Sequence, residues 1–197
     1  MGKGGSFERE VAKRLSLWYT DGEADDLFWR THASGGRATQ RFKKGKNLDG
    51  HVGDICAIDS RGEALTNHWS IEIKTGYANT NKSMSKDGEI VRTKTLWSLL
   101  DKLDSKQEVT TFEKFWEQCE KQAESLNKLP VLIFRRNGRS ACIAMPQMFL
   151  GEYQSIKILE TSYFVLKFNS ISRVVVVMNL NDFFECFQDP KTRFGWE

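Results

Sequence analysis

The chain has 197 residues, of which 40% are hydrophobic and 28% charged, with 13 Phe and 6 Trp. This apolar content is enough for a folded core and excludes global disorder. The longest apolar run, Val174 to Met178, is too short to cross a bilayer, and the first residues lack the apolar core of a signal peptide. We therefore expect a folded protein of the cytoplasm.

The cysteines are widely spaced and form no CxxC pair. They are Cys56, Cys119, Cys142 and Cys186. With only three histidines beside them, the chain offers no motif for a structural zinc site. We predict reduced thiols in an intracellular, reducing compartment.

One stretch of the chain is strongly basic, although the net charge of the whole chain, +3, does not by itself indicate a binding partner. Between Arg30 and Asp49 the only acid is Asp49 itself. The cations of this stretch are Arg30, Arg37, Arg41, Lys43, Lys44 and Lys46. Such a stretch can bind nucleic-acid phosphates. It can equally be a solvated loop, and charge alone leaves both interpretations open.

The first half of the chain predicts one helix, three short strands and a polar loop. Ser6 can cap a helix over 6–19, with Glu8 and Glu10 in its first turn and apolar residues recurring at helical spacing. Strands are expected over 27–31, 52–59 and 69–74, the last two paired antiparallel. Residues 76–94 are polar and predict a loop.

The second half predicts two helices followed by four strands and a final helix. The helices are expected over 96–103 and 112–126, and the last one over 181–187. Strands are expected over 130–134, 140–145, 163–168 and 173–178, the first two joined by an Asn137-Gly138 turn. This order indicates a single α/β (α+β) domain with a central mixed β-sheet flanked by helices.

The residues with the clearest chemistry are Asp54 and the triplet Glu72-Ile73-Lys74. Residues two apart in a strand share a face, so Glu72 and Lys74 project side by side. If the strand that contains Asp54 pairs with theirs, two carboxylates and an ammonium group converge. Carboxylates suit a hard cation such as Mg²⁺, which acidifies water and offsets charge on a phosphate. Alone, such a triplet is more often a solvated pair on a strand face.

Four segments that follow one another along the chain favour a functional role for this triplet over a solvated pair. They are GKGGSFERE at 2–10, RTHASGG at 30–36, GDI at 53–55 and IEIK at 71–74. Together they resemble the PD-(D/E)XK nuclease superfamily, most closely its archaeal-type Holliday-junction resolvases. The resemblance covers about residues 2–75 and resumes over about 112–146. It implies a restriction-endonuclease-like fold, with a polar insertion at about 76–111 and a C-terminal strand and helix extension at about 147–197.

The resemblance also implies roles for individual residues. It implies a metal site of Glu8, Asp54, Glu72 and Ile73, with Lys74 as the catalytic lysine. Helical phase independently favours Glu8, which lies nearer the apolar stripe of its helix than Glu10 does. In such resolvases an arginine and a serine approach the scissile phosphate, and Arg30 and Ser34 occupy these places, with Ser34 counted as catalytic.

Several features depart from the resolvase pattern. Gly53 stands where the proline that names the superfamily is expected, and Ser34 and Asp54 lie farther apart than in compact resolvases. Gln118 and Gln122 could position phosphates, and an ordinary helix surface explains them equally well.

The sequence therefore predicts an endonuclease that hydrolyses phosphodiester bonds with Mg²⁺, for which Mn²⁺ can substitute. From the resemblance we expect branched DNA as the substrate and a homodimer as the assembly, with no membrane partner. One alternative is a restriction-like or phage-type nuclease on linear or single-stranded DNA. The other is a catalytically silent DNA-binding relative.

Overall fold

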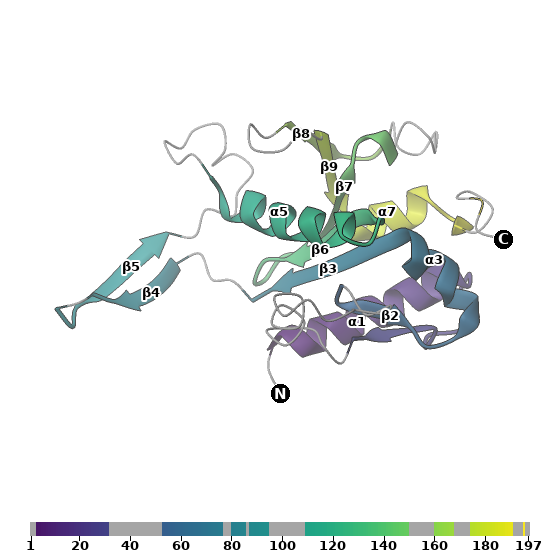
Figure 1. Cartoon of the computed structure of the whole chain (residues 1–197), viewed down its shortest axis with the longest axis horizontal. Helices are drawn as coiled ribbons and strands as arrows, with labels where there is room; N and C mark the ends of the chain where they lie inside the picture. Colours follow the sequence, from purple (N-terminus) through teal and green to yellow (C-terminus); the bar gives the residue numbers. More distant parts are fainter. Residues whose placement is uncertain are drawn as a thin grey trace.

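The core of the fold is a five-stranded mixed sheet with strand order β3-β6-β7-β9-β8 (Figure 1). The computed structural model describes residues 3–31, 53–76, 80–85, 87–94, 109–149, 160–167, 174–190 and 195. The sheet strands are β3 (Trp69–Thr75), β6 (Leu129–Arg135), β7 (Ala141–Pro146), β8 (Tyr163–Lys167) and β9 (Val174–Asn179). β3 and β6 are parallel and all other neighbours antiparallel, which confirms the predicted α/β class with a central mixed sheet.

Helix α5 (Thr111–Glu124) follows from the parallel pairing of β3 and β6. Parallel neighbours need a crossover connection, and this one returns through a helix packed on the sheet. The helix begins at a capping box, in which the Thr110 hydroxyl accepts from Glu113 N while the Glu113 carboxylate accepts from Thr110 N. The expected helix over 112–126 is confirmed to within two residues at each end.

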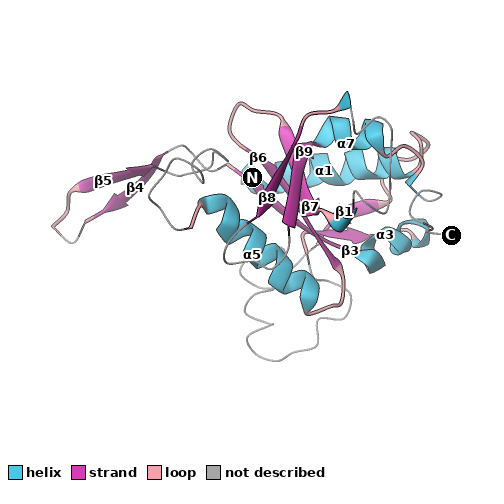
Figure 2. Ribbon diagram, turned by 90° about the horizontal axis from the view of Figure 1, so that it is seen from above, coloured by secondary structure: helices cyan, strands magenta, loops and turns pink. Residues whose placement is uncertain are grey.

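Helices cover both faces of the sheet (Figure 2). α1 (Lys3–Tyr19) and α7 (Leu180–Cys186) pack on one face, whose strand residues include Ile71, Ile73 and Ile133. α5 packs on the other face, against Leu132 and Phe134. Because strand residues alternate between faces, Glu72 and Lys74 lie on the α5 side.

The C-terminal segment belongs to this core. β9 pairs with β7, and β8 pairs with the other edge of β9. From α7, Phe183 packs against Trp18 with ring centroids 5.5 Å apart and against Trp69 at 6.2 Å. The Trp18 indole also donates to the carbonyl of Phe187 at 2.8 Å. The predicted extension therefore completes the sheet and closes one of its faces.

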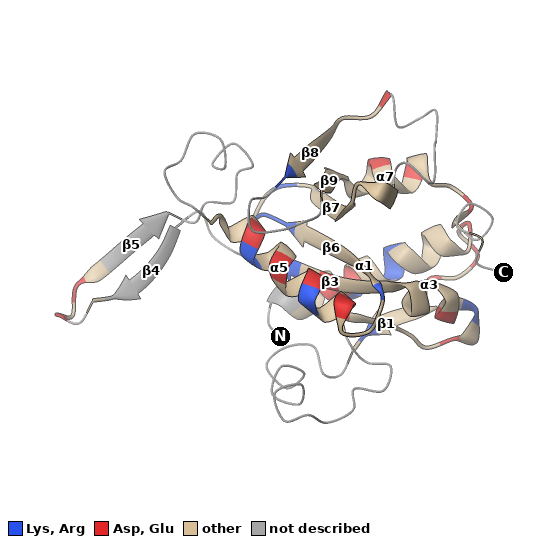
Figure 3. Cartoon of the chain, turned by 45° about the horizontal axis from the view of Figure 1, so that its top comes forward, with Lys and Arg blue, Asp and Glu red and all other residues tan. Residues whose placement is uncertain are grey.

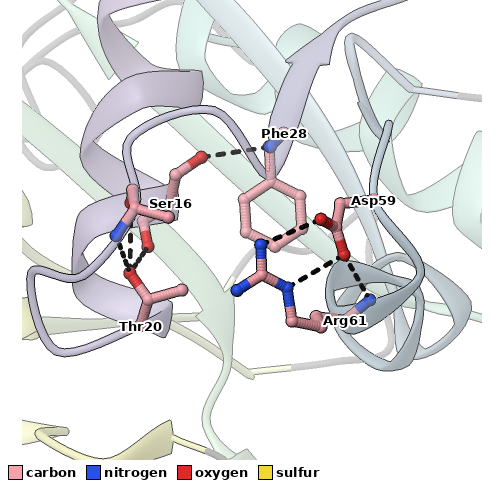
Figure 4. A network of polar contacts seen from close by, with 6 residues as sticks. Ser16, Thr20, Phe28, Asp59 and Arg61 are labelled. Carbon is pink, nitrogen blue, oxygen red and sulfur yellow. Dashed lines mark hydrogen bonds and ion pairs between the residues drawn. The ribbon is translucent and has the colours of Figure 1, made fainter.

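A second, two-stranded sheet corrects the expected pairing of the strand after Asp54. β1 (Phe28–Arg30) pairs antiparallel with β2 (Ile55–Ala57), and β2 forms no ladder with β3. The prediction was wrong because a 3-10 turn, η1 (Ser60–Gly62), and the short helix α3 (Glu63–His68) separate β2 from β3. Asp59 begins that turn by accepting from Arg61 N at 2.9 Å (Figure 4).

The end of α1 is tied to β1 by buried hydroxyl groups (Figure 4). The Ser16 hydroxyl donates to Ala12 O at 2.9 Å and accepts from Phe28 N at 3.0 Å. One turn later, the Thr20 hydroxyl donates to Ser16 O at 2.8 Å. These bonds satisfy buried polar groups and fix the position at which the chain enters β1.

The start of α1 also differs from the prediction. The helix begins at Lys3, so Ser6 lies inside it and is not its cap, and its first turn contains no acid. Glycines disfavour a helix, but the burial of Phe7, Val11 and Leu15 stabilises it enough to include them. The helix ends at Tyr19, as expected.

The polar segment after β3 is not a loop throughout. β4 (Thr80–Met84) and β5 (Ile90–Lys94) form an antiparallel hairpin, which stands away from the sheet in Figure 1. The loop prediction was wrong because polar composition hid a turn signal at Asp87-Gly88. Gly88 has a φ of 79°, and Ser85 N donates to Glu89 O at 2.8 Å across the turn.

The remaining elements agree with the sequence prediction where they can be compared. β6, β7, β8, β9 and α7 lie within one or two residues of the expected bounds, and Gly138 has the positive φ of 69° that its turn needs. The helix expected over 96–103 lies outside the described residues. Among the residues the structure describes, no helix has the length and apolar character to cross a membrane.

Candidate active site

Among the described residues, β3 is an edge strand of the central sheet, and Asp54 lies along the edge of β3 that faces away from β6. Its main-chain N donates to Ile71 O at 2.7 Å, and its Oδ2 accepts from Ile73 N at 2.7 Å. Asp54 is only 8% exposed. These two bonds, rather than a strand ladder, bring Asp54 beside Glu72 and Lys74.

Gly53 makes this close approach possible. Its φ is +95°, and a Cβ atom there would lie 2.9 Å from Ile71 O. Proline has a φ fixed near −65°, so it cannot adopt this conformation. The departure from the superfamily's proline is therefore required by the local backbone. Thr31 holds the segment from the other side, donating through its hydroxyl to Gly53 O at 2.9 Å and through its N to Asp54 O at 3.0 Å.

Glu72 and Lys74 project together toward α5, as their spacing predicts. Lys74 Nζ donates to Glu72 Oε1 and lies 5.5 Å from the centre of the Phe115 ring. Gln118 Nε2, also from α5, donates to the same Glu72 oxygen at 3.0 Å. Glu72 is only 5% exposed. In this nearly buried setting its carboxylate is stabilised by the Lys74 ammonium and the Gln118 amide.

Glu8 reaches this region from α1. Its side chain is 14% exposed against 41% for Glu10, which confirms the inward orientation expected from helical phase. Glu8 Oε2 lies 2.9 Å from Arg30 Nε in an ion pair. The guanidinium group of Arg30 lies against Gly5, where a Cβ atom would be only 2.7 Å from Nη1. Glu10 instead accepts two bonds from Arg135 Nη1, at 2.9 and 2.8 Å.

Comparison with protein families agrees with this geometry. Residues 1–98 and 92–191 match a family model described as "Phage putative PDDEXK endonuclease", which covers most of the chain. The chain belongs to this family. No curated protein and no solved structure is significantly similar to it.

Membership in the PDDEXK endonuclease family confirms the superfamily resemblance and supports the assignment of the chain as a nuclease. Nucleases of this type generally depend on a divalent metal. The match does not distinguish a Holliday-junction resolvase from other nucleases of the family.

The electrostatics of this endonuclease centre on Asp54. The pKa of Asp54 is raised to about 7, mainly by burial and also by the nearby negative charges of Glu72 and Glu8. The hydrogen bond from Ile73 N and the charge of Lys74 act in the opposite direction without cancelling the effect. Burial and the charge of Glu72 therefore make the ionised form of Asp54 unfavourable, and a bound cation would stabilise that form.

The donor set fits a hard divalent cation. The Asp54 carboxylate lies at the edge of β3, and Glu72 is near enough for its charge to act on it. The Ile73 carbonyl points to the same edge as Asp54, because N–H and C=O of one strand residue point the same way. Within the described part of the chain, no three His, Cys, Asp or Glu side chains already form a metal-binding cluster. Glu8 acts on Asp54 through its charge while paired with Arg30.

Several predicted site residues lie outside the described residues, and their roles stay predictions. They are Ser34, Arg37, Arg41, Lys43, Lys44 and Lys46. Gln118 is the contact that sequence reasoning left out. It stands directly before Cys119 of the buried stripe of α5, but only the packing of α5 on β3 reveals its bond to Glu72. The cysteines are free thiols, two buried and two half-buried.

Proposed function

We propose that the chain is a divalent-metal-dependent DNA endonuclease whose active site is formed by Asp54, Glu72, Lys74 and Glu8. The observation that carries this proposal is the bond from Ile73 N to Asp54 Oδ2. It sets the Asp54 carboxylate beside the strand from which Glu72 and Lys74 project. The proposed nuclease domain extends over residues 1–197.

Each residue has a distinct task in this proposal. Asp54, Glu72 and the Ile73 carbonyl hold the cation, Mg²⁺ or in its place Mn²⁺, and Glu8 completes the negative site from α1. When bound, the ion supplies the Lewis acidity that activates water and neutralises phosphate charge. The Lys74 ammonium, held beside Glu72, stabilises negative charge that develops on the phosphate.

The DNA is expected to approach from the side of β1 and the basic stretch after it. Ser34 and Arg30 would lie near the scissile phosphate, and Arg37, Arg41, Lys43, Lys44 and Lys46 would bind the backbone. Arg30 contacts Glu8 in the DNA-free structure, so it also links phosphate binding to the metal site.

For the substrate we propose branched DNA cut by a homodimer in the cytoplasm, on the resemblance to resolvases. The family match supports a phage-type nuclease on linear or single-stranded DNA equally well. A catalytically silent DNA-binding relative is disfavoured, because a surface that only binds phosphates gains nothing from buried carboxylates.

The test is a cleavage assay on four-way junction, linear duplex and single-stranded DNA of matched sequence, with Mg²⁺, Mn²⁺ or EDTA. We expect metal-dependent cutting that Asp54→Asn abolishes and that the control Asp59→Asn, a surface acid paired with Arg61, retains. Paired nicks in the junction alone support a resolvase, and cutting of linear DNA supports the broader nuclease. Undiminished cutting by Asp54→Asn, or in EDTA, contradicts the proposed site.

A further inference from the structure

The β4–β5 hairpin has no role in the site described above. Among the described strands, β4 and β5 pair only with each other. Figures 1 and 2 both show the ribbon projecting away from the central sheet and its helices. An isolated two-stranded hairpin is only marginally stable in water, so this ribbon gains most from a binding partner.

The register of the hairpin gathers cationic residues on one face. Lys82 is the partner of Arg92, and Thr80 is the partner of Lys94. Because residues two apart in a strand share a face, Lys82, Arg92 and Lys94 occupy one face of the ribbon. The positions of the opposite face carry no charge; they are Asn81, Ser83, Val91 and Thr93.

This arrangement costs the free hairpin stability. Like charges directly opposite each other in an antiparallel pair are destabilising, and Lys82 and Arg92 are such a pair. A bound polyanion would turn this repulsion into attraction. The cationic face is therefore better suited to a partner than to the hairpin by itself.

Acidic residues lie at the other end of the hairpin. Asp87 and Glu89 are exposed in the turn, which is seen as the acidic tip in Figure 3. Lys82 and Arg92 lie at the middle of their strands, and Lys94 lies at the end of β5, where the ribbon leads back to the rest of the chain. The turn sequence 85–89 also contains Lys86, which lies outside the described residues, so the net charge of the turn is −1. A polyanion would accordingly bind the middle and base of the ribbon in preference to its tip.

The base of the ribbon is tied to the candidate active site by the chain itself. β3, which carries Glu72 and Lys74, ends at Thr75, and β4 begins at Thr80. Five residues span at most about 17 Å, which corresponds to roughly five base pairs along a duplex. Lys94 lies opposite Thr80, about 5 Å away across the ribbon, so the first cation of the face lies within about 22 Å of the end of β3.

We propose that the β4–β5 hairpin binds duplex DNA through Lys82, Arg92 and Lys94, beside the bond that is cut. A two-stranded ribbon fits the major groove, and the cationic face contacts the phosphate backbone. The inference rests on the proposed function and adds a DNA-binding element to it.

The test is the binding of a fluorescent duplex in EDTA, measured by anisotropy over a range of salt concentrations. One variant combines Lys82→Gln, Arg92→Gln and Lys94→Gln. A matched control combines Lys13→Gln, Arg61→Gln and Lys167→Gln, which removes equal charge from surfaces away from the hairpin. A third variant keeps the charge with Lys82→Arg, Arg92→Lys and Lys94→Arg. Circular dichroism establishes that each is folded.

We expect the glutamine variant to weaken binding at least about tenfold and to make the dependence of log K on log salt shallower by about two to three. The control and the charge-conserving variant should bind like the wild type. If the glutamine variant keeps the salt dependence of the wild type, the hairpin proposal is overturned. The proposed nuclease function still stands in that case, provided that the wild type binds and cuts DNA. A wild type that neither binds nor cuts DNA overturns both. The glutamine variant is also tested for binding to phosphatidylserine vesicles. If it loses vesicle binding while its DNA binding is unchanged, the hairpin proposal is overturned as well.

Discussion

At the scale of single residues, Asp54 carries the largest electrostatic strain in the described part of the site. Its carboxylate is buried beside Glu72 and compensated by one main-chain hydrogen bond, from Ile73 N. In a low-dielectric setting two such charges repel each other strongly. Strain of this kind is typical of groups placed for binding or catalysis rather than for stability.

Asp54→Asn should therefore stabilise the metal-free protein at neutral and alkaline pH. The pKa of Asp54 rises from 3.8 to about 7 on folding, so the folded state holds the proton more tightly and loses stability as the pH rises between these values. Asparagine keeps an acceptor for Ile73 N without the charge. We expect a gain of about 4 kcal/mol near pH 8 that vanishes near pH 4, measured by urea unfolding in EDTA. A gain that does not change with pH contradicts this explanation.

The absence of a side chain at Gly53 allows Asp54 to approach β3 closely. A methyl group there would meet the carbonyl oxygen of Ile71 at 2.9 Å, in addition to the strain of a φ of +95°. Gly138 is a matched control, because it also has a positive φ but has nothing within 4 Å of an added Cβ. We expect Gly53→Ala to cost about 1–3 kcal/mol more than Gly138→Ala in unfolding experiments. Equal costs would show that the approach to Ile71 is not tight.

At the scale of elements, α5 contributes to the site through Gln118. Its amide donates to Glu72 Oε1 at 3.0 Å, so α5 orients a proposed metal ligand. We expect Gln118→Ala to weaken Mn²⁺ binding about tenfold by calorimetry and to slow cleavage similarly. Gln122→Ala, one turn farther along α5, serves as the control. Unchanged Mn²⁺ affinity in Gln118→Ala would make Gln118 a simple surface residue.

The long, periodic elements could be predicted from the sequence and the short ones could not. Apolar stripes in α1 and α5 and β-rich runs in β6 and β9 determine their type locally. The pairing of β2 with β1 depends instead on α3, a helix of six residues without a side-chain cap. The β4–β5 hairpin escaped prediction because its strands are polar and lack a buried face in the sequence pattern.

The same distinction applies to the candidate site. Spacing alone predicts that Glu72 and Lys74 lie together, and helical phase predicts that Glu8 faces inward. The bond between Asp54 and β3 depends on the positive φ of Gly53, and the bond from Gln118 depends on how α5 packs. Contacts of this kind come from tertiary structure, which no local pattern encodes.

At the scale of the whole molecule, the central sheet connects the elements that carry the candidate site. The parallel pair β3 and β6 lies between α1 on one face and α5 on the other. Of these elements, α1, β3 and α5 each supply a polar side chain to the candidate site. The C-terminal strands and α7 complete the same sheet and its aromatic core. Glu8, Glu72 and Lys74 are thus held by regular elements, Asp54 is held by hydrogen bonds to β3, and the hairpin that we propose to bind DNA projects from the core.

The most direct test of the proposed active site is the single-turnover cleavage rate of Lys74→Ala. Lys74 contributes nothing to the main-chain bonds that hold Asp54, and Glu72 keeps its bond from Gln118 when Lys74 is removed, so the variant should fold and still bind DNA, with folding checked by circular dichroism. We expect cleavage to slow by about a hundredfold or more, because the variant lacks the charge beside the reacting phosphate. Lys128→Ala, which removes a lysine that donates to Thr66 O away from the site, should cut at the wild-type rate. Cleavage by Lys74→Ala at the wild-type rate would contradict the assignment of this site.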